Sequence, residues 1–301
     1  MNGGLYAATI ATMTSEERLD AASQEMHFAS VLNTAGLDGL LLNGHAGEGG
    51  FLSPEEQMQV IRSARDVAPD KRILAAVGAE SSAQAAADAR SAVQAGADGI
   101  MVFAPFSWAL GADPRAIVAH HRAIAAASEA PIYLFQGAAG KLGYAPDTLR
   151  ALLDIDTVAG IKEGSWEVKA YEVTRRITRA ARPDVAVMAS GDEHLFACFM
   201  IGSDGSAVSL AAIVPELIVA LDRAVRAGDH AKALTIHTVL FDFAALVYAA
   251  PGHMAAARLK ACLAELGRIP HEICRAPTPP VLPAERAALM AALRPCLELS
   301  L

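Results

Sequence analysis

Cysteine is scarce in this chain, and its few cysteines are not spaced for a structural role. No Cys-x-x-Cys pair occurs among the four, which are Cys198, Cys262, Cys274 and Cys296. Cysteine pairs at short spacing are typical of zinc sites, and a dense framework of them is typical of small secreted domains. The sequence therefore favours reduced thiols and argues against a disulfide scaffold.

Runs of basic residues are absent as well, and the overall charge is negative. The chain has 25 lysines and arginines against 33 aspartates and glutamates, which gives a formal net charge of −8. A protein that binds nucleic acid needs a concentrated positive surface that faces the phosphates. We therefore exclude nucleic acid as a partner.

A leader peptide and a membrane span are not indicated either. Residues 1–6 lack the basic-then-apolar order of a signal peptide. The longest apolar stretch, Leu234–Ala250, contains His237 and Asp242. It is too polar for a span and shorter than the roughly 20 residues that cross a bilayer. We expect a cytoplasmic protein that has no membrane partner.

Apolar residues, by contrast, are abundant at 53% and follow a repeating order. Short apolar runs alternate with polar or glycine-containing loops and with Ala-rich stretches of helical period. The predicted strands are Leu5–Ile10, Gly39–Leu42, Ile73–Val77, Gly99–Val102, Ile132–Phe135, Val158–Ile161, Val185–Met188 and Gly205–Val208. The predicted helices are Pro54–Val67, Ser82–Ala95, Pro114–Ala127, Pro146–Leu153, Val168–Ala181, Pro215–Ala227, Ala231–Ala249, His253–Leu266 and Pro283–Leu293.

This order predicts an α/β fold, a (β/α)8 TIM barrel. The alternative is a doubly wound open sheet, which requires a glycine-rich fingerprint after the first strand, and residues 8–17 have none. The predicted strands stop at about Leu210. We expect a catalytic barrel domain over residues 1–225 and a C-terminal helical extension over residues 226–301, packed on the barrel.

Lys162 stands at the end of a predicted buried strand. The apolar run Val158–Ile161 ends on this lysine, and the strand breaks at Gly164. In a barrel, catalytic groups lie at the C-terminal ends of the strands. A lysine there loses water, which lowers its pKa and leaves more neutral amine to attack a ketone or aldehyde. The position therefore suits a Schiff base, and a lysine that merely extends to solvent is the alternative.

Other predicted strands carry candidate groups as well. The second ends in a glycine-rich turn, residues 43–50, whose backbone N–H groups can hold a carboxylate. Tyr133 lies within the fifth strand, where its hydroxyl can transfer protons at the barrel mouth or be satisfied in the core. Acidic residues and histidines show no spacing typical of metal ligands. We predict no metal and no cofactor.

Together these motifs resemble one family. A glycine-rich turn with Gly-Glu follows strand two, a tyrosine lies in strand five, Gly-Ile-Lys closes strand six, and Ser-Gly-Asp follows strand seven. The same order is typical of the dihydrodipicolinate synthase / N-acetylneuraminate lyase family of class I aldolases and lyases. The segment from Leu259 to Pro280 is similar to the closing segment of that family, so the resemblance covers nearly the whole chain.

The resemblance implies that Lys162 forms an imine with a 2-oxo acid, of the pyruvate or 2-keto-3-deoxy sugar acid type. It implies that Tyr133 moves protons at that imine and that Glu48 holds the turn after strand two. The residues that it places at the substrate are Gly44, His45, Ala46, Gly47, Ser107, Gly191, Ala207 and Val208. It also implies a homo-oligomer, either a dimer or a tetramer.

The chain departs from the family pattern at several positions. His45 and Ala46 replace a pair of hydroxyl residues, so His45 is a candidate for the missing proton relay or a loop residue that shapes the pocket. Ser107 stands near the place of a second tyrosine, and residues 134–140 lack the arginine of the synthase. We therefore predict a Schiff-base lyase or aldolase that is not the lysine-biosynthetic synthase. A dehydratase or deaminase that uses the same imine, and a non-catalytic protein that binds 2-oxo acids, are the alternatives.

Overall fold

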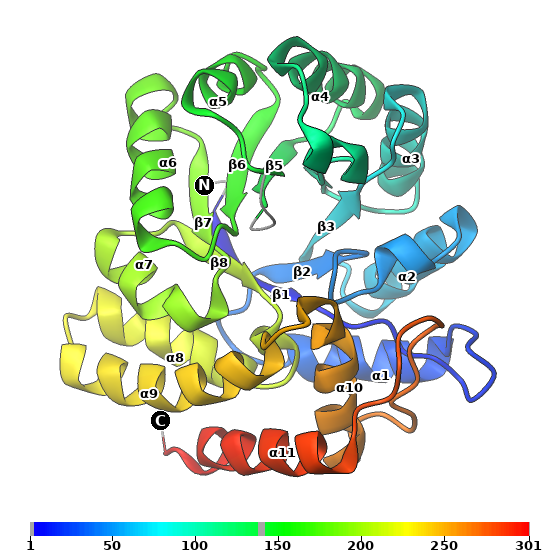
Figure 1. The fold of residues 1–301 in the computed structure, drawn as a ribbon, viewed down its shortest axis with the longest axis vertical. Coiled ribbons are helices and arrows are strands. Elements are labelled where there is room, and N and C mark those ends of the chain that lie inside the picture. Colours follow the sequence, from blue (N-terminus) through cyan, green and yellow to red (C-terminus); the bar gives the residue numbers. More distant parts are fainter. Residues whose placement is uncertain (1–2, 138–141, 301) are drawn as a thin grey trace.

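The computed structural model describes residues 3–137 and 142–300. Within these residues, eight parallel strands form a closed barrel in which each strand pairs with the next and β8 pairs with β1 (Figure 1). The strands are β1 (Gly4–Ala8), β2 (Gly39–Leu42), β3 (Arg72–Val77), β4 (Gly99–Val102), β5 (Ile132–Gln136), β6 (Val158–Glu163), β7 (Ala186–Ala189) and β8 (Gly205–Val208). The predicted (β/α)8 barrel is confirmed.

Helices follow the strands and form the outer layer of the barrel (Figure 1). They are α1 (Ala21–Leu32), α2 (Pro54–Val67), α3 (Ser82–Gln94), α4 (Pro114–Ser128), α5 (Pro146–Leu153), α6 (Val168–Ala181), α7 (Leu195–Ile201) and α8 (Pro215–Arg226). Short 3-10 turns are η1 (Gly49–Phe51), η2 (Phe106–Leu110), η4 (Asp192–His194), η5 (Leu210–Ala212) and η6 (Gly252–Met254). Helices α1 and α7 lie where none was predicted, because α1 is only weakly amphipathic and α7 is a seven-residue, largely apolar run that has no helical period.

Several helices begin at caps that the sequence supplies. The Ser53 hydroxyl accepts a hydrogen bond from the Glu56 N–H at 3.2 Å, and the Glu56 carboxylate accepts one from the Ser53 N–H at 2.8 Å. Asp113 caps α4 in a similar way and accepts from the Arg115 N–H at 2.8 Å. Each such cap stabilises a helix by about 1 kcal/mol. These caps fix the first residues of α2 and α4, and therefore the last residues of the loops that lead into these helices.

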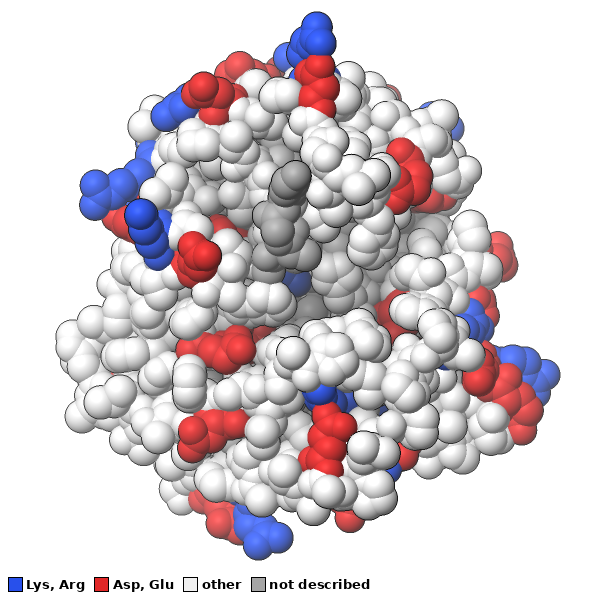
Figure 2. Space-filling model, viewed as in Figure 1, with Lys and Arg blue, Asp and Glu red and all other residues white. Residues whose placement is uncertain are grey.

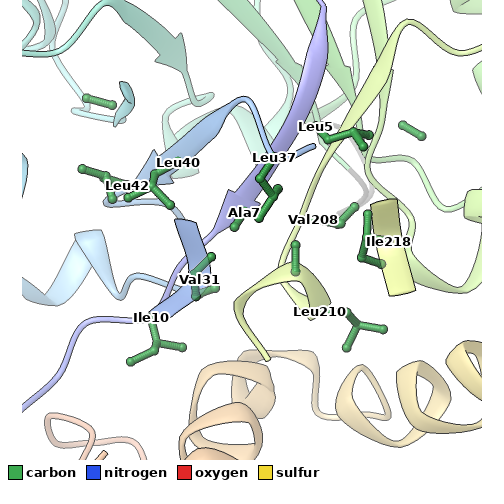
Figure 3. Close-up of a cluster of buried hydrophobic side chains, with 14 of the residues drawn as sticks. Leu5, Ala7, Ile10, Val31, Leu37, Leu40, Leu42, Val208, Leu210 and Ile218 are labelled. Atoms are coloured by element: carbon green, nitrogen blue, oxygen red, sulfur yellow. The ribbon is translucent and has the colours of Figure 1, made fainter. Parts of the chain in front are cut away.

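Alternation of side chains along the strands creates two cores. One fills the barrel and includes Tyr6, Leu41, Leu74, Met101, Phe103, Tyr133, Phe135, Met188 and Ala207. The other lies between the strands and the helices (Figure 3), and includes Leu5, Ala7, Leu40, Leu42, Val208, Val31 of α1 and Ile218 of α8. A side chain at the end of a strand therefore faces either the barrel mouth or the helix layer, according to its register.

Three more helices follow α8: α9 (His230–Val247), α10 (Ala255–Glu265) and α11 (Pro283–Glu298). Helix α9 packs on α8 and on α11, and Figure 1 shows this group along one side of the barrel. The domain boundary between residues 225 and 226 stays a prediction. Helix α11 continues past its predicted end at Leu293. It tolerates Pro295 because this residue lies in the last turn, where its missing N–H removes only one backbone hydrogen bond.

By length and apolar composition alone, α9 could cross a membrane, which differs from the expectation that this stretch is too short and too polar. In the described structure, 33% of that stretch is buried. A core helix of a soluble protein passes the same test, so one such helix is weak evidence for a membrane span.

Candidate active site

Lys162 lies at the C-terminal end of β6 and is 8% exposed. Burial lowers its pKa to about 8, and the nearby Asp192 carboxylate opposes part of this shift. Its ammonium nitrogen lies 5.1 Å from the centroid of the Phe135 ring. Figure 2 shows a hollow near the middle of the face in view, with a basic group at its floor. Lys162 is therefore a poorly hydrated amine at the open end of the barrel.

The register of β5 against β6 decides which aromatic side chain accompanies Lys162. Phe135 pairs with Lys162, whereas Tyr133 pairs with Gly160. Two residues along a strand correspond to about 6.6 Å. Tyr133 therefore lies one layer deeper in the barrel, and an apolar ring occupies the place that the family resemblance gives to its phenol. Of the two interpretations of Tyr133, this position favours a hydroxyl satisfied in the core over one that transfers protons at the barrel mouth.

The surroundings of Tyr133 belong to the other end of the barrel. Its ring packs so closely on Gly160 that a Cβ atom there would come within 2.6 Å of it. Its hydroxyl interacts with Tyr6, which in turn accepts from Arg72, the first residue of β3, at 3.5 Å. Burial raises the pKa of Tyr133 well above its ordinary value. This phenol is a satisfied core group.

The glycine-rich turn after β2 is tightly closed. The N–H of Gly49 donates to the Gly44 carbonyl at 3.1 Å, and that of Glu48 donates to the His45 carbonyl at 3.1 Å. A Cβ atom at Gly49 would come within 1.9 Å of the Asn43 carbonyl oxygen, so glycine is required there. Among the described residues, the N–H groups of residues 45–47 donate no hydrogen bond. That the backbone of Gly44, His45, Ala46 and Gly47 holds a carboxylate stays a prediction.

His45 extends from this turn toward two aromatic rings. Its imidazole meets Phe103 edge-on at 5.0 Å and Phe135 at 5.7 Å between centroids. The residue as a whole is exposed to solvent. The walls of the mouth and the charge of Lys162 lower the pKa of His45 below its ordinary value. His45 is therefore neutral at pH 7 and lies near the amine.

Glu48 anchors the turn to the C-terminal helices. Its carboxylate forms an ion pair with Lys260 of α10, and both side chains are almost fully buried. Lys260 also donates to the Ile273 carbonyl at 2.8 Å. The Cys274 thiol lies beside this pair, and burial raises its pKa to about 12. This contact supports the predicted role of Glu48 in holding the turn.

A carboxyl group that the sequence analysis did not assign lies on the other side of Lys162. Asp192 follows Gly191 at the end of β7 and is 4% exposed. Its Oδ2 atom accepts from the Leu210 N–H at 2.9 Å, and burial raises its pKa to about 7. The hydroxyl of Tyr248, the residue that follows α9, interacts with this carboxyl group. The motif Ser-Gly-Asp pointed to Asp192, but no local signal pointed to Tyr248.

The remaining predicted residues lie at different depths. Ala207 faces the barrel interior, whereas the Val208 side chain faces the helix layer, so Val208 could reach a substrate only through its backbone. Gly191 lies under the Trp166 ring. Ser107 is exposed on η2, and its N–H donates to the Glu80 carboxylate at 3.3 Å. The contacts of Ser107 are thus with Glu80 rather than with Lys162.

A separate cleft of about 280 Å³ lies on the outer wall, between α5 and α6. It is lined by Gln136, Tyr144, Glu167, Lys169 and neighbouring apolar residues, and Lys162 is not among them. Among the residues that the structure describes, no group of three His, Cys, Asp or Glu side chains is placed to hold a metal ion. The outer cleft is therefore separate from the lysine at the barrel mouth.

The chain is similar to known lyases over most of its length. The sequence profile of the dihydrodipicolinate synthetase family matches residues 1–295. An uncharacterized DapA-like lyase from Halobacterium salinarum is 31% identical over 255 residues, which are 82% of this chain and 80% of that protein. A probable 2-dehydro-3-deoxy-D-pentonate aldolase from Escherichia coli K12 is 28% identical over 222 residues, 72% of this chain and 73% of that protein.

Solved structures share the fold. YagE, a prophage protein from E. coli K12 solved in complex with pyruvate, has a TM-score of 0.88 at 24% identity, with 98% of each chain covered. A dihydrodipicolinate synthase from Acinetobacter baumannii has a TM-score of 0.89 at 24% identity, with 99% of this chain and 100% of that chain covered. The profile match over nearly the whole sequence establishes the relationship: the chain belongs to the dihydrodipicolinate synthetase family, a family of class I lyases and aldolases.

Proposed function

We propose that the protein is a lyase or aldolase that forms an imine between Lys162 and a 2-oxo acid of the pyruvate or 2-keto-3-deoxy sugar acid type. The observation that carries this proposal is the buried amine of Lys162 at the end of β6. With a pKa of about 8 instead of 10.5, the neutral fraction at pH 7 rises roughly 300-fold. Neutral amine is the nucleophile that condenses with a ketone.

The turn after β2 supports a 2-oxo acid as the substrate class. In the closed strand order, β2 stands across the barrel from β6. A ligand whose keto carbon meets Lys162 can therefore direct a neighbouring carboxylate toward the open N–H groups of residues 45–47. The pyruvate complex of YagE and the aldolase relative from E. coli agree with this class.

We further propose that the reaction is not that of the lysine-biosynthetic synthase. His45, Ala46 and Phe135 stand where the family resemblance expects hydroxyl groups. The predicted absence of the synthase arginine concerns residues 134–140, of which 138–140 lie outside the described residues. The imine itself serves carbon–carbon cleavage, addition and elimination alike, so a dehydratase or deaminase uses the same first step.

A non-catalytic protein that binds 2-oxo acids is the second candidate. Phe135 supports it, because an apolar ring beside Lys162 cannot pass protons. A panel of 2-oxo acids and sugar acids distinguishes the candidates: released pyruvate indicates an aldolase, a product with an unchanged carbon chain indicates a dehydratase or deaminase, and tight binding without any product indicates a binding protein.

We also propose a homo-oligomer, a dimer or a tetramer. Family membership supports this. Phe106 at 72% and Leu110 at 88% are strongly exposed apolar side chains of η2 that a subunit contact could cover. Light scattering at several protein concentrations measures the size, and a monomer throughout contradicts this proposal.

Reductive trapping tests the imine directly. Pyruvate with cyanoborohydride should attach a stable adduct to the peptide that contains Lys162, as read by mass spectrometry. Lys260 is the internal control, because it is fully buried and ion-paired with Glu48 and should stay unmodified. Lys162→Ala should abolish the adduct. Wild-type protein that stays unmodified at Lys162 while exposed lysines react would refute the proposed function.

A further inference from the structure

The mouth of the barrel has no phenol beside Lys162 on β5, but it has a carboxyl and a phenol on the β7 side. Strand β7 is the other neighbour of β6, and Met188 pairs with Lys162. Asp192 lies four residues after Met188, where its charge acts on the amine of Lys162. The amine therefore has an apolar wall on one side and an acid–base group on the other.

The carboxyl group is held in a fixed position. The Leu210 N–H donates to its Oδ2 atom at 2.9 Å, and this donor comes from the loop after β8. The hydroxyl of Tyr248 interacts with both Asp192 and Ser209. Fixed donors of this kind orient a carboxylate without the cost of ordering it during the reaction.

Tyr248 reaches the mouth from outside the barrel. It ends α9, and its ring lies 5.7 Å from that of Trp166, which follows β6. Asp192 is 4% exposed, whereas Tyr248 is half-buried and meets solvent along part of its surface. Part of Tyr248 thus reaches the protein surface, while its hydroxyl lies on the side of the buried carboxyl group.

We propose that Asp192 is the group that removes and returns the proton at C3 of the imine formed on Lys162, and that Tyr248 connects Asp192 to solvent. This pair takes the place that the family resemblance assigns to a strand-five tyrosine. The proposal rests on the proposed function. It makes Asp192 a further catalytic residue and Tyr248 a further proton-transfer residue for the same reaction.

The electron and proton balance is simple. Lys162 attacks the keto carbon, a C–N bond forms, and water leaves to give a protonated imine. The Asp192 carboxylate then takes one proton from C3, and the pair of that C–H bond becomes the C2–C3 double bond of a neutral enamine. The carboxyl proton passes to the Tyr248 oxygen while the phenol proton passes to water, and the reverse steps return a solvent proton to C3.

The charges around the barrel mouth favour a substrate orientation in which C3 faces Asp192. The substrate carboxylate is held at the turn after β2, across the barrel from β6, and is repelled from Asp192 by like charge. The carbon chain of the substrate is therefore directed toward β7. Burial, which raises the pKa of Asp192 to about 7, suits a base that works near neutral pH.

Solvent exchange into pyruvate tests the pair without knowledge of the physiological substrate. In D2O, enamine formation replaces the methyl hydrogens of pyruvate by deuterium, which proton NMR follows. Tyr248→Phe and Asp192→Asn should each slow this exchange by about 10²-fold or more. Trapping of the imine at Lys162 should persist in both variants. Tyr171→Phe is the matched control, because its hydroxyl donates to the Val187 carbonyl on the helix side of β7, and it should exchange at the wild-type rate.

The outcomes separate the two proposals. Wild-type protein that forms no imine refutes the proposed function itself. Wild-type protein that traps pyruvate but exchanges no methyl hydrogen overturns the pair, and so does exchange within about twofold of wild type in both variants. Variants that lose trapping together with exchange while near-UV circular dichroism is unchanged also overturn it, because the pair would then position Lys162 rather than move the proton.

Discussion

The pH dependence of imine trapping reports how far burial lowers the pKa of Lys162. The amine attacks only when it is neutral, so the trapping rate rises with pH until the pKa of Lys162 is passed. Burial lowers this pKa to about 8. The rate should therefore fall about tenfold for each pH unit below that value and level off above it.

The magnitude follows from the burial. A fall from 10.5 to about 8 corresponds to about 3 kcal/mol that disfavours the ammonium inside the barrel. The Asp192 carboxylate acts in the opposite direction, because a negative charge stabilises the ammonium. Asp192→Asn removes that charge, so the pKa of Lys162 should fall further and the half-rise should move to lower pH.

The assay is the rate of adduct formation at Lys162 with pyruvate and cyanoborohydride, from about pH 6 to 10. Trapping of a small model amine under the same conditions corrects for the reagent. A wild-type half-rise near 10 would show a well-hydrated lysine and refute the reasoning. A shift of the Asp192→Asn curve to higher pH would contradict the assigned effect of the carboxylate.

Three further predictions concern other residues of the barrel. Tyr133→Phe should change turnover by less than about threefold, because its hydroxyl contacts Tyr6 at the far end of the barrel; a loss of about 10²-fold, the scale of a proton-transfer group, would restore its predicted role. His45→Ala should leave the rise of turnover with pH in place and change the pH of its midpoint little, because the imidazole is already neutral at pH 7. Loss of that rise would show that His45 relays protons. Lys260→Met should destabilise the protein by about 3–5 kcal/mol in urea unfolding, because the Glu48 carboxylate stays buried without a partner; a change below about 1 kcal/mol would contradict this.

Most of the fold followed from local patterns. The eight strands lie within about two residues of their predicted ends, because short apolar runs bounded by glycine and polar turns have few other solutions in a barrel. Helix starts with Ser-Pro or Asp-Pro were placed well, as at Pro54 and Pro114. Helix α7 was missed because an apolar run of seven residues shows no period.

Of the candidate site, the sequence by itself determined the position of the lysine and the glycine-rich turn: Lys162 ends a buried strand, and a run of glycines closes the turn after β2. The aromatic neighbour of Lys162 and the contact between Tyr248 and Asp192 were decided by the tertiary structure alone. Register between β5 and β6 is a property of two strands together, and it places Phe135 beside Lys162 and Tyr133 a layer below. Tyr248 reaches Asp192 because α9 folds back against the barrel, and packing between distant segments leaves no local trace in either one.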